Sequence, residues 1–223
     1  MTGDRYALVI AGPSAVGKTT IMDAIFASDS RFSYVRSTRT RPPRVGSADD
    51  GYIHIDDSGF MKIVASGGML EYMEYAGYRY GTQQAELDRI FESGKYPFLI
   101  LDKNGILSLK SKKRDFTPVV VYIYDFLDTL EARLAERLMT GEPEEQKKND
   151  YIYRTNRNAE DYAALSGDFG GCIDFFVRNV TVDGTVREII SAFDGVREGT
   201  PPPDGREALP RLAEEGRKKL ADG

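Results

Sequence analysis

The sequence predicts an α/β fold in which a parallel core sheet is flanked by helices. Short apolar runs alternate along the chain with stretches that have helical spacing, which is the pattern of an open parallel sheet. A glycine-rich loop joins the first apolar run to the first expected helix. Short strand-like segments follow one another only between residues 33 and 82, so we expect a small mixed-sheet insertion there.

Each expected core strand is a short apolar run, as is typical of strands buried on both faces. The run at 118–124 is also rich in β-branched and aromatic residues, which favour strands. Within the insertion, we expect a hairpin that turns at Ala76-Gly77. In chain order the expected strands are 6–11, 32–37, 52–55, 69–75, 78–80, 97–101, 118–124 and 173–177.

The expected helices have apolar residues three and four positions apart, and glycines near several of their ends. The last one shows this most clearly, with Val186, Ile189, Ile190 and Phe193 on one side. Residues 139–150 are polar and contain Gly and Pro, which predicts a mobile segment. The expected helices are 20–27, 60–65, 83–93, 128–138, 151–165 and 182–196.

Composition narrows the class of protein. The chain has 223 residues, a net charge of -5 and a pI of about 5.1, so we expect no nucleic-acid partner, because nucleic acids attract clustered basic residues. Cys172 is the single cysteine, which fits a reducing compartment. No apolar run is long enough for a membrane helix, and the start lacks the features of a signal peptide. We therefore expect a cytoplasmic protein with no membrane partner.

The chain divides into a main domain, residues 1–198, and a charged tail, residues 199–223. Three consecutive prolines after Thr200 interrupt the pattern of the main domain. The tail has only Leu209, Leu212 and Leu220 as large apolar residues. Its composition predicts a partly helical, solvated appendage.

The glycine-rich loop matches the complete phosphate-binding pattern of Gly, four free positions, Gly, Lys and Thr. Its glycines allow backbone N–H groups to converge on phosphate oxygens, and the helix that follows directs its positive end to the same place. Lys18 adds a charge, and the Thr19 hydroxyl can bind Mg²⁺. The expected triphosphate-binding residues are Gly12, Pro13, Ser14, Ala15, Val16, Gly17, Lys18, Thr19 and Thr20.

A second anion site is indicated by Arg36, Arg39, Arg41 and Arg44, which lie within nine positions. Guanidinium groups bind phosphate through paired hydrogen bonds, and the two prolines at 42–43 stiffen the loop. A phosphate-binding loop beside a triphosphate site suggests a phosphoryl acceptor that already carries a phosphate. A solvated basic loop and a nucleic-acid patch remain the alternatives.

Together with later blocks, these motifs resemble guanylate kinase from residue 5 to about 197. The blocks are the phosphate loop, Ser37-Thr38-Arg39-Thr40-Arg41 with Arg44-Val45-Gly46, Leu70-Glu71-Tyr72, Tyr80-Gly81-Thr82 and Leu101-Asp102-Lys103-Asn104-Gly105. The resemblance implies a P-loop kinase fold with a GMP-binding insertion at about 33–83 and a lid at about 136–156. It also implies transfer of the γ-phosphate of ATP to GMP, giving GDP and ADP, with Mg²⁺ as cofactor. dGMP is a further expected acceptor, and the chain is expected to be a monomer or a homodimer.

The resemblance also implies roles for residues on the acceptor side. Glu71 would read guanine, because a carboxylate can accept hydrogen bonds from both N1–H and the 2-amino group, a pair that adenine lacks. An exposed strand carboxylate is the alternative for Glu71, and a helix cap is the alternative for Asp102. The implied set comprises Arg41, Arg44, Tyr52 and Tyr80 for the GMP phosphate, Ser37, Glu71 and Thr82 for the base, and Asp102 near the acceptor and the metal.

On the donor side, the resemblance implies that arginines neutralise charge on the transferred group as the lid closes. These are Arg133 and Arg137 before the lid and Arg154 or Arg157 after it. Asn179 would lie beside the adenine. Thr19 would bind Mg²⁺, with Asp102 acting through water. The implied catalytic residues are Lys18, Arg41, Arg137, Arg154 and Arg157.

Three departures from the family pattern leave alternatives open. Ser47 stands where the family usually has a glutamate, Ile100 stands where it usually has the first aspartate of an Asp-x-Asp pair, and the lid lacks the usual Gly-Arg-Gly. The loss of two carboxylates raises the alternative of a kinase for another phosphorylated acceptor, such as a ribose bisphosphate. A non-catalytic binding module with the same fold is the third hypothesis.

Overall fold

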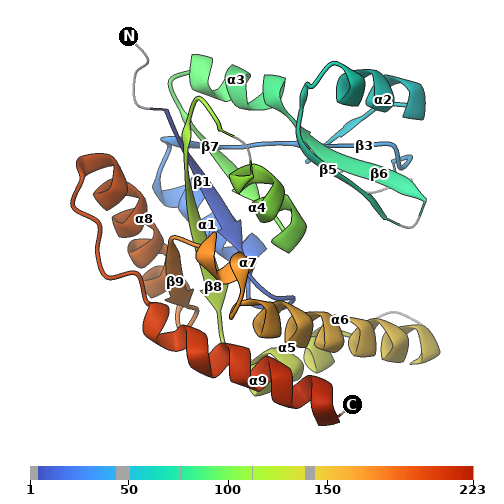
Figure 1. Ribbon diagram of the computed structural model, residues 1–223, viewed down its shortest axis with the longest axis vertical. Helices are drawn as coiled ribbons and strands as arrows, with labels where there is room; N and C mark the ends of the chain where they lie inside the picture. Colours follow the sequence, from blue (N-terminus) through green and yellow to red (C-terminus); the bar gives the residue numbers. More distant parts are fainter. Residues whose placement is uncertain (1–4, 44–50, 76, 112, 139–143, 223) are drawn as a thin grey trace.

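The computed structural model describes residues 5–43, 51–75, 77–111, 113–138 and 144–222. Its core is a five-stranded, wholly parallel sheet with the strand order β2-β7-β1-β8-β9 (Figure 1). The predicted parallel core sheet is therefore confirmed. Its strands are β1 (Tyr6–Ala11), β2 (Phe32–Tyr34), β7 (Tyr96–Ile100), β8 (Thr117–Tyr124) and β9 (Phe175–Arg178).

Strand β1 lies at the centre of this sheet and is buried from Ala7 to Ala11. It pairs in parallel with β7, where Ile10 is opposite Ile100, and with β8, where Ile10 is opposite Val121. The carboxyl ends of these three strands consequently meet at one edge of the sheet. This edge is where open α/β sheets bind ligands.

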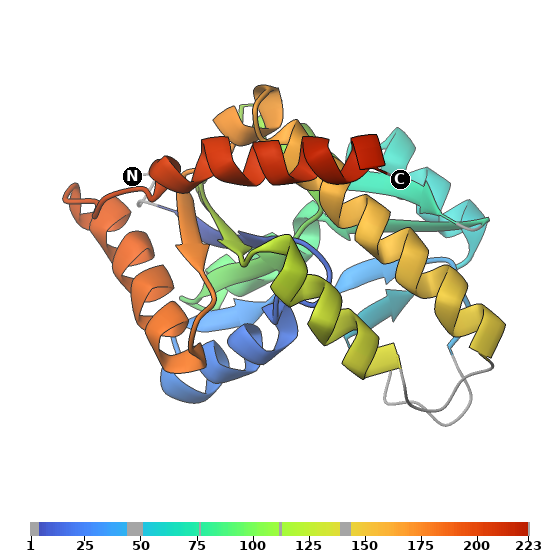
Figure 2. The ribbon, with the colours of Figure 1, turned by 90° about the horizontal axis from the view of Figure 1, so that it is seen from below.

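Helices cover both faces of the core sheet. Helices α1 (Lys18–Ser28) and α8 (Val182–Glu198) pack together on one face, whereas the short helix α7 (Asp168–Gly171) lies on the other (Figure 2). On the α8 side, the ring of Phe193 packs edge-on against Phe32 and Tyr96 with 5.0 Å between ring centres. Such aromatic pairs add to the stabilisation that comes from burial alone.

The expected insertion is a four-stranded mixed sheet with the order β4-β3-β6-β5. Strand β3 pairs in parallel with β4, and the other two pairings are antiparallel. The prediction of one strand over 32–37 was wrong, because β2 and β3 belong to different sheets and Val35-Arg36 connects them. The insertion comprises β3 (Ser37–Arg39), β4 (Tyr52–His54), α2 (Asp57–Ala65), β5 (Met69–Tyr75) and β6 (Tyr78–Gln83), and α3 (Gln84–Glu92) follows it.

The sequence patterns did not predict helix α4 (Lys103–Lys110), which directly follows β7. It is short and contains a glycine, so its helical pattern is weak. Asp102 caps it by accepting a hydrogen bond from the Gly105 N–H at 2.9 Å, and Ile106 and Leu109 are buried. This cap and the apolar face together account for the helix.

Helices α5 (Leu127–Leu138) and α6 (Glu144–Ala164) flank the expected lid. Residues 144–150, which were expected to be mobile, are the first turns of α6, so that part of the prediction was wrong. The charged side chains within 145–150 fit this part of the helix, which is mostly exposed. The rest of the expected mobile segment, 139–143, lies outside the described residues.

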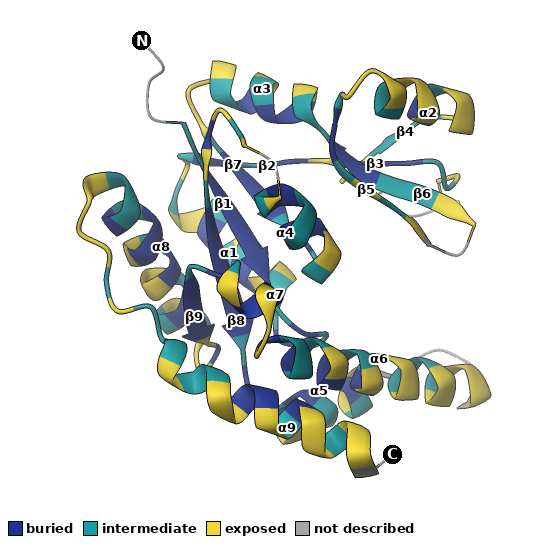
Figure 3. Cartoon of the chain, in the orientation of Figure 1, coloured by how far each residue is buried: buried dark blue, intermediate teal, exposed yellow. Residues whose placement is uncertain are grey.

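The C-terminal segment differs from the solvated appendage that its composition predicted. It forms a short 3₁₀ helix η1 (Arg206–Ala208) and the helix α9 (Leu209–Asp222), which confirms only its helical character. Helix α9 lies along α6 and turns a buried side toward the body of the protein (Figures 2 and 3). Leu212 and Ala213 have 0% and 1% of their surface exposed, so the helix is anchored by apolar burial. No helix in the described part of the chain is long and apolar enough to cross a membrane.

Candidate active site

The phosphate loop connects β1 to α1 at the ligand-binding edge of the core sheet. Gly12 and Gly17 have φ angles of 149° and 96°, which side chains rarely tolerate. A Cβ on Gly12 would also collide with the carbonyl oxygen of Ile123. Gly17 precedes Lys18, the first residue of α1, and supplies no capping side chain. The first N–H groups of α1 therefore face the loop, as in an anion site.

Lys18 bends back across the phosphate loop. Its Nζ atom donates hydrogen bonds to the carbonyl oxygens of Gly12 and Pro13, both at 2.8 Å. Burial lowers the pKa of Lys18 to about 8; the charge of Asp161 opposes this shift, whereas Arg154 and Arg137 contribute to it. A phosphate at this position would favour the protonated lysine, because it supplies an opposite charge.

Two asparagines from distant parts of the chain hydrogen-bond to the backbone of the phosphate loop. Asn179 donates from Nδ2 to the carbonyl oxygen of Val16 at 2.7 Å and accepts from the Thr185 hydroxyl at 3.0 Å. Its predicted contact with adenine stays a prediction. Asn158 on α6 was not predicted; its Oδ1 accepts from the Ser14 N–H at 2.7 Å and its Nδ2 donates to the Ser14 carbonyl at 3.3 Å. No motif marks an asparagine in the middle of a helix, so it could not be predicted from the sequence.

A cavity of about 250 Å³ opens beside the phosphate loop. It lies at the carboxyl ends of β1 and β7, where the fold was expected to bind ligands. Its charged groups come from three elements: the start of α1, the start of α4 and the middle of α6. The charged and amide side chains that line it are Lys18, Asp102, Lys103, Arg157, Asn158 and Asp161.

A second cavity of about 280 Å³ lies between the mixed sheet and the end of β7. The structure thus brings together five of the predicted acceptor residues, which are Ser37, Tyr52, Glu71, Tyr80 and Asp102. Both cavities are lined by Ile100, Leu101 and Asp102. A molecule in one cavity would therefore adjoin a molecule in the other.

Glu71 and Thr82 form a hydrogen-bonded pair across β5 and β6. The Thr82 hydroxyl donates to Glu71 Oε1 at 2.7 Å, and Thr82 itself is only 2% exposed. Desolvation raises the pKa of the Glu71 carboxyl; the Thr82 hydrogen bond opposes this shift, and the charge of Asp102 adds to it. Glu71 is therefore not an ordinary exposed strand carboxylate, because one of its oxygens is fixed and the group lines a cavity.

The arginine loop is only partly described. Arg44 and Ser47 lie outside the described residues. The Arg41 carbonyl oxygen is 3.0 Å from His54 Nδ1, and the Arg41 side chain is not part of the lining of the second cavity. Arg39 belongs to the predicted arginine loop, although the resemblance gave it no role of its own, and it stacks its guanidinium 3.9 Å from the ring centre of Tyr52. It thereby contacts one of the predicted phosphate ligands.

Asp102 lies where the two cavities meet and bonds to two groups. Besides capping α4 through Oδ1, it lies 3.4 Å from Arg157 through Oδ2. Arg157 also lies 3.8 Å from Asp161. The helix-capping alternative for Asp102 is therefore correct, and its role toward a metal stays a prediction.

The remaining predicted arginines differ in their surroundings. Arg133 pairs with Asp125 at 2.9 Å, and Arg178 shares that buried carboxylate at 3.2 Å. Arg154 pairs with Asp150 one helical turn earlier, at 2.8 Å. Arg154 and Arg137 both depress the pKa of Lys18, so their charges act on the phosphate loop.

The part of the chain that the structure describes contains no magnesium site made by the protein alone. Among the described residues, no group of three or more His, Cys, Asp or Glu side chains gathers to hold a metal. This is compatible with Mg²⁺, which usually keeps several waters and binds one or two protein ligands together with substrate phosphates. Thr19 and Asp102 would supply such a small set.

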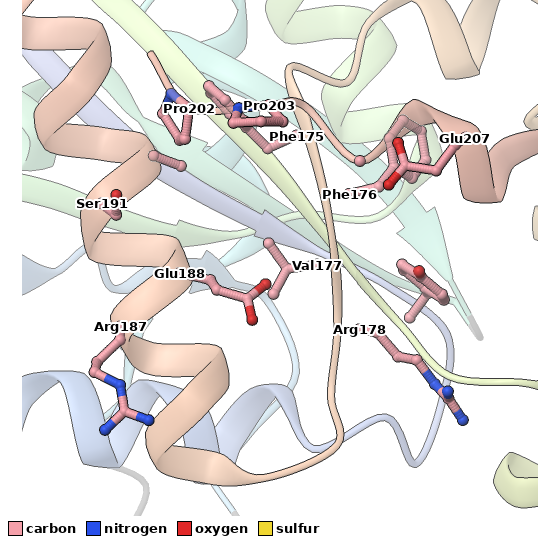
Figure 4. Close-up of a pocket in the computed structure, with 13 residues that line it drawn as sticks. Phe175, Phe176, Val177, Arg178, Arg187, Glu188, Ser191, Pro202, Pro203 and Glu207 are labelled. Atoms are coloured by element: carbon pink, nitrogen blue, oxygen red, sulfur yellow. The ribbon is translucent and has the colours of Figure 1, made fainter. Parts of the chain in front are cut away.

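A further cavity of about 520 Å³ lies away from the phosphate loop. It is bounded by β9, α8 and the segment at Pro202 and Pro203 (Figure 4). It shares no lining residue with either of the two cavities described above. We therefore assign the phosphate chemistry to the two smaller cavities, which adjoin the phosphate loop and Glu71.

A complete phosphate loop at the carboxyl edge of a parallel sheet defines a P-loop nucleotide-binding protein. A second cavity with a fixed carboxylate adjoins it, as a two-substrate site requires. The guanylate kinase family model matches residues 4–194. The chain therefore belongs to the guanylate kinase family.

Individual relatives agree with this assignment. The chain is 38% identical over 132 residues to a guanylate kinase of Lactococcus lactis subsp. lactis (strain IL1403), covering 58% of this chain and 63% of that protein. It is 39% identical over 132 residues to a guanylate kinase of Streptococcus pyogenes serotype M3 (strain ATCC BAA-595 / MGAS315), covering 58% and 62%. These alignments span less than two thirds of either relative. The crystal structure of a guanylate kinase from Anaplasma phagocytophilum has a similar fold, with a TM-score of 0.58, 18% identity, and coverage of 95% of this chain and 94% of that chain.

Proposed function

We propose that the protein is a nucleoside monophosphate kinase that transfers the γ-phosphate of ATP to GMP, giving ADP and GDP. One observation carries the proposal: the phosphate-loop cavity and the Glu71 cavity adjoin through Ile100, Leu101 and Asp102. A donor phosphate in the first cavity and an acceptor phosphate in the second would meet at this junction. Membership of the guanylate kinase family supports the choice of substrates.

In this proposal the protein acts mainly by positioning the substrates and stabilising charge, since phosphoryl transfer needs little covalent chemistry from the enzyme. Lys18 and the loop N–H groups would bind the donor phosphates, and Arg137 and Arg154 would approach from the lid at about 136–156. Mg²⁺ bound with ATP would neutralise phosphate charge, with Thr19 and Asp102 as its protein-side partners.

On the acceptor side, the insertion at about 33–83 would bind GMP. An ionised Glu71 would accept hydrogen bonds from guanine N1–H and the 2-amino group, and Thr82 already orients it at 2.7 Å. An adenine base would leave this partly buried carboxylate unpaired, which strongly disfavours the wrong substrate. Tyr52 and Tyr80 would donate their hydroxyl hydrogens to the GMP phosphate, together with Arg41 and Arg44.

A second candidate is a kinase for a different phosphorylated acceptor. Ile100, at the junction of the two cavities, provides no carboxylate there. Less negative charge at this point would accommodate a more highly charged acceptor, such as a ribose bisphosphate.

A coupled assay of ADP formation across GMP, dGMP, AMP, CMP, UMP and a ribose bisphosphate separates these candidates. The proposal expects turnover with GMP, weaker turnover with dGMP and little with the other nucleotides. ADP formation with another acceptor and none with GMP would refute it. Failure to bind ATP by isothermal titration calorimetry would instead support a non-catalytic module.

A further inference from the structure

We propose that Asn158 is a positioning residue for the phosphate loop, and that the C-terminal helix α9 holds it in place through α6. The inference rests on the proposed function only in taking the loop as the site of the ATP phosphates. Asn158 is 1% exposed and lies on α6, 144 positions from the residue it contacts. Its amide bonds to both the N–H and the carbonyl of Ser14.

These two hydrogen bonds fix backbone groups in the middle of the phosphate loop. Ser14 lies between Gly12 and Ala15, where φ is 149° and 63°, so the chain here is in an uncommon conformation. Such conformations persist when surrounding contacts hold them. A loop already held in its binding shape loses less conformational entropy when phosphate binds. Asn158 therefore contributes to nucleotide affinity by holding the loop in its binding shape.

Helix α6 is itself held from its other side by α9. Gly216 on α9 approaches the α6 backbone so closely that a Cβ would lie 2.5 Å from both the Ala159 carbonyl oxygen and the Ala163 nitrogen. Ala159 follows Asn158 directly, and it is also fully buried. One turn of α6 thus lies between the phosphate loop and α9. Any shift at the Gly216 contact would move Asn158 relative to Ser14.

Polar contacts tie α9 to α5 as well. Glu215 accepts a hydrogen bond from the Leu127 N–H at 3.2 Å, and Lys219 pairs with Glu131 at 2.8 Å. Helix α9 therefore contacts both helices that flank the expected lid, α5 through these polar contacts and α6 through close packing. Because α9 lies beyond residues 4–194, the part matched by the family model, this support comes from a segment outside the family domain.

The first test is Asn158→Ala in the full chain, with MgADP titrated by calorimetry and hydrogen exchange measured at the Ser14 amide. Loss of both hydrogen bonds should weaken MgADP binding about tenfold and make the Ser14 amide exchange faster. In steady-state assays the KM for ATP should rise and the KM for GMP should stay the same. The exposed neighbour Glu160→Gln is the control and should behave as the parent protein.

Unchanged MgADP affinity and unchanged exchange at Ser14 in Asn158→Ala would overturn the proposal. If that variant does not fold, Asn158→Asp takes its place, because a carboxylate has the same shape and still accepts from the Ser14 N–H. Slow exchange at Ser14 should then persist, and fast exchange would overturn the proposal. Binding and exchange are measured without any acceptor, so they do not depend on whether GMP is the substrate.

The second test is Gly216→Ala. If α9 had no close neighbour, this change would stabilise it, since alanine is the better helix former. The contact with α6 predicts the opposite, a lower melting temperature and an approximately threefold weaker binding of MgADP. Ala221→Val, which enlarges an exposed position of the same helix, is the control.

A double-mutant cycle connects the two tests. If α9 acts through Asn158, Gly216→Ala should have no further effect on MgADP affinity once Asn158 is alanine. Fully additive effects of the two changes on affinity would show that α9 does not act through Asn158, and would overturn that part of the proposal.

Discussion

The phosphate loop and the acceptor cavity are built in different ways. The phosphate loop is one short segment, and its backbone is held by Lys18, Asn158 and Asn179. The acceptor cavity takes side chains from β3, β4, β5, β6 and the end of β7. Among its predicted residues, Glu71 and Thr82 are the pair that the described structure joins by a hydrogen bond.

This difference indicates that the donor site is formed before any substrate binds, whereas the acceptor site depends on how two sheets are placed. Substitutions in the phosphate loop should therefore affect every substrate. Substitutions in the acceptor cavity should affect only the acceptor. The predictions below test this division, beginning with the largest expected effect.

Replacing Lys18 with methionine should lower kcat/KM by about 10³-fold or more, because the charge that stabilises the transferred phosphate is lost. The loss should be the same for GMP and dGMP in steady-state assays. Lys62→Met, at an exposed position of α2, is the control. A loss confined to one acceptor would contradict the division between donor and acceptor sites.

Replacing Glu71 with glutamine should lower kcat/KM for GMP by about 10² to 10³, because an amide cannot accept from both guanine donors. The KM for ATP should stay unchanged, since Glu71 does not line the phosphate-loop cavity. Glu74→Gln, at an exposed position of the same strand, is the matched control. Equal activity of the Glu71 variant and the parent would point to an acceptor other than GMP.

Replacing each of the two α6 arginines, Arg154 and Arg157, should lower kcat by different amounts. Arg154→Ala should lower kcat about 10²-fold, because the charge of Arg154 acts on Lys18. Arg157→Ala should lower kcat only about tenfold, because Arg157 is paired with Asp102 and Asp161. Single-turnover rates at saturating ATP and GMP measure the difference. A larger loss for Arg157→Ala would assign the transferred phosphate to Arg157 instead.

The pH dependence of nucleotide binding should be the smallest effect. The free protein holds Lys18 at a pKa of about 8, and phosphate binds the protonated lysine, so affinity should fall as pH rises through that value. MgADP should bind about tenfold more weakly at pH 9 than at pH 7. Calorimetry at both pH values measures this fall, and Lys18→Met should abolish it. An affinity independent of pH in the parent would contradict the lowered pKa.

The sequence predicted the core sheet well, because each buried strand is a continuous apolar run. It placed β1, β7, β8 and β9 to within two residues at each end. It was wrong at 32–37, where β2 and β3 join different sheets, because a run of alternating residues does not reveal which sheet a strand enters. It also missed α4, whose short length gives too little periodicity to recognise.

The sequence predicted some residues of the site and missed others, because contacts between distant segments are not visible in a local pattern. Glu71, Tyr52, Tyr80 and Ser37 do line one cavity, although only the resemblance to a known family connected them beforehand. Arg44 and Ser47 lie outside the described residues, so their roles stay predictions. Asn158 was missed, because a buried asparagine within a polar helix has no sequence signal until its partner is known.

The sequence by itself determined the phosphate loop, since that geometry depends on the conformational freedom of Gly12 and Gly17 and on the helix that begins at Lys18. These are local properties of consecutive residues. Tertiary structure alone decided that α9 packs against α6, that Asn158 reaches Ser14, and that two cavities meet at Asp102. Those contacts join residues far apart in the chain, so they exist only after the sheets and helices have packed.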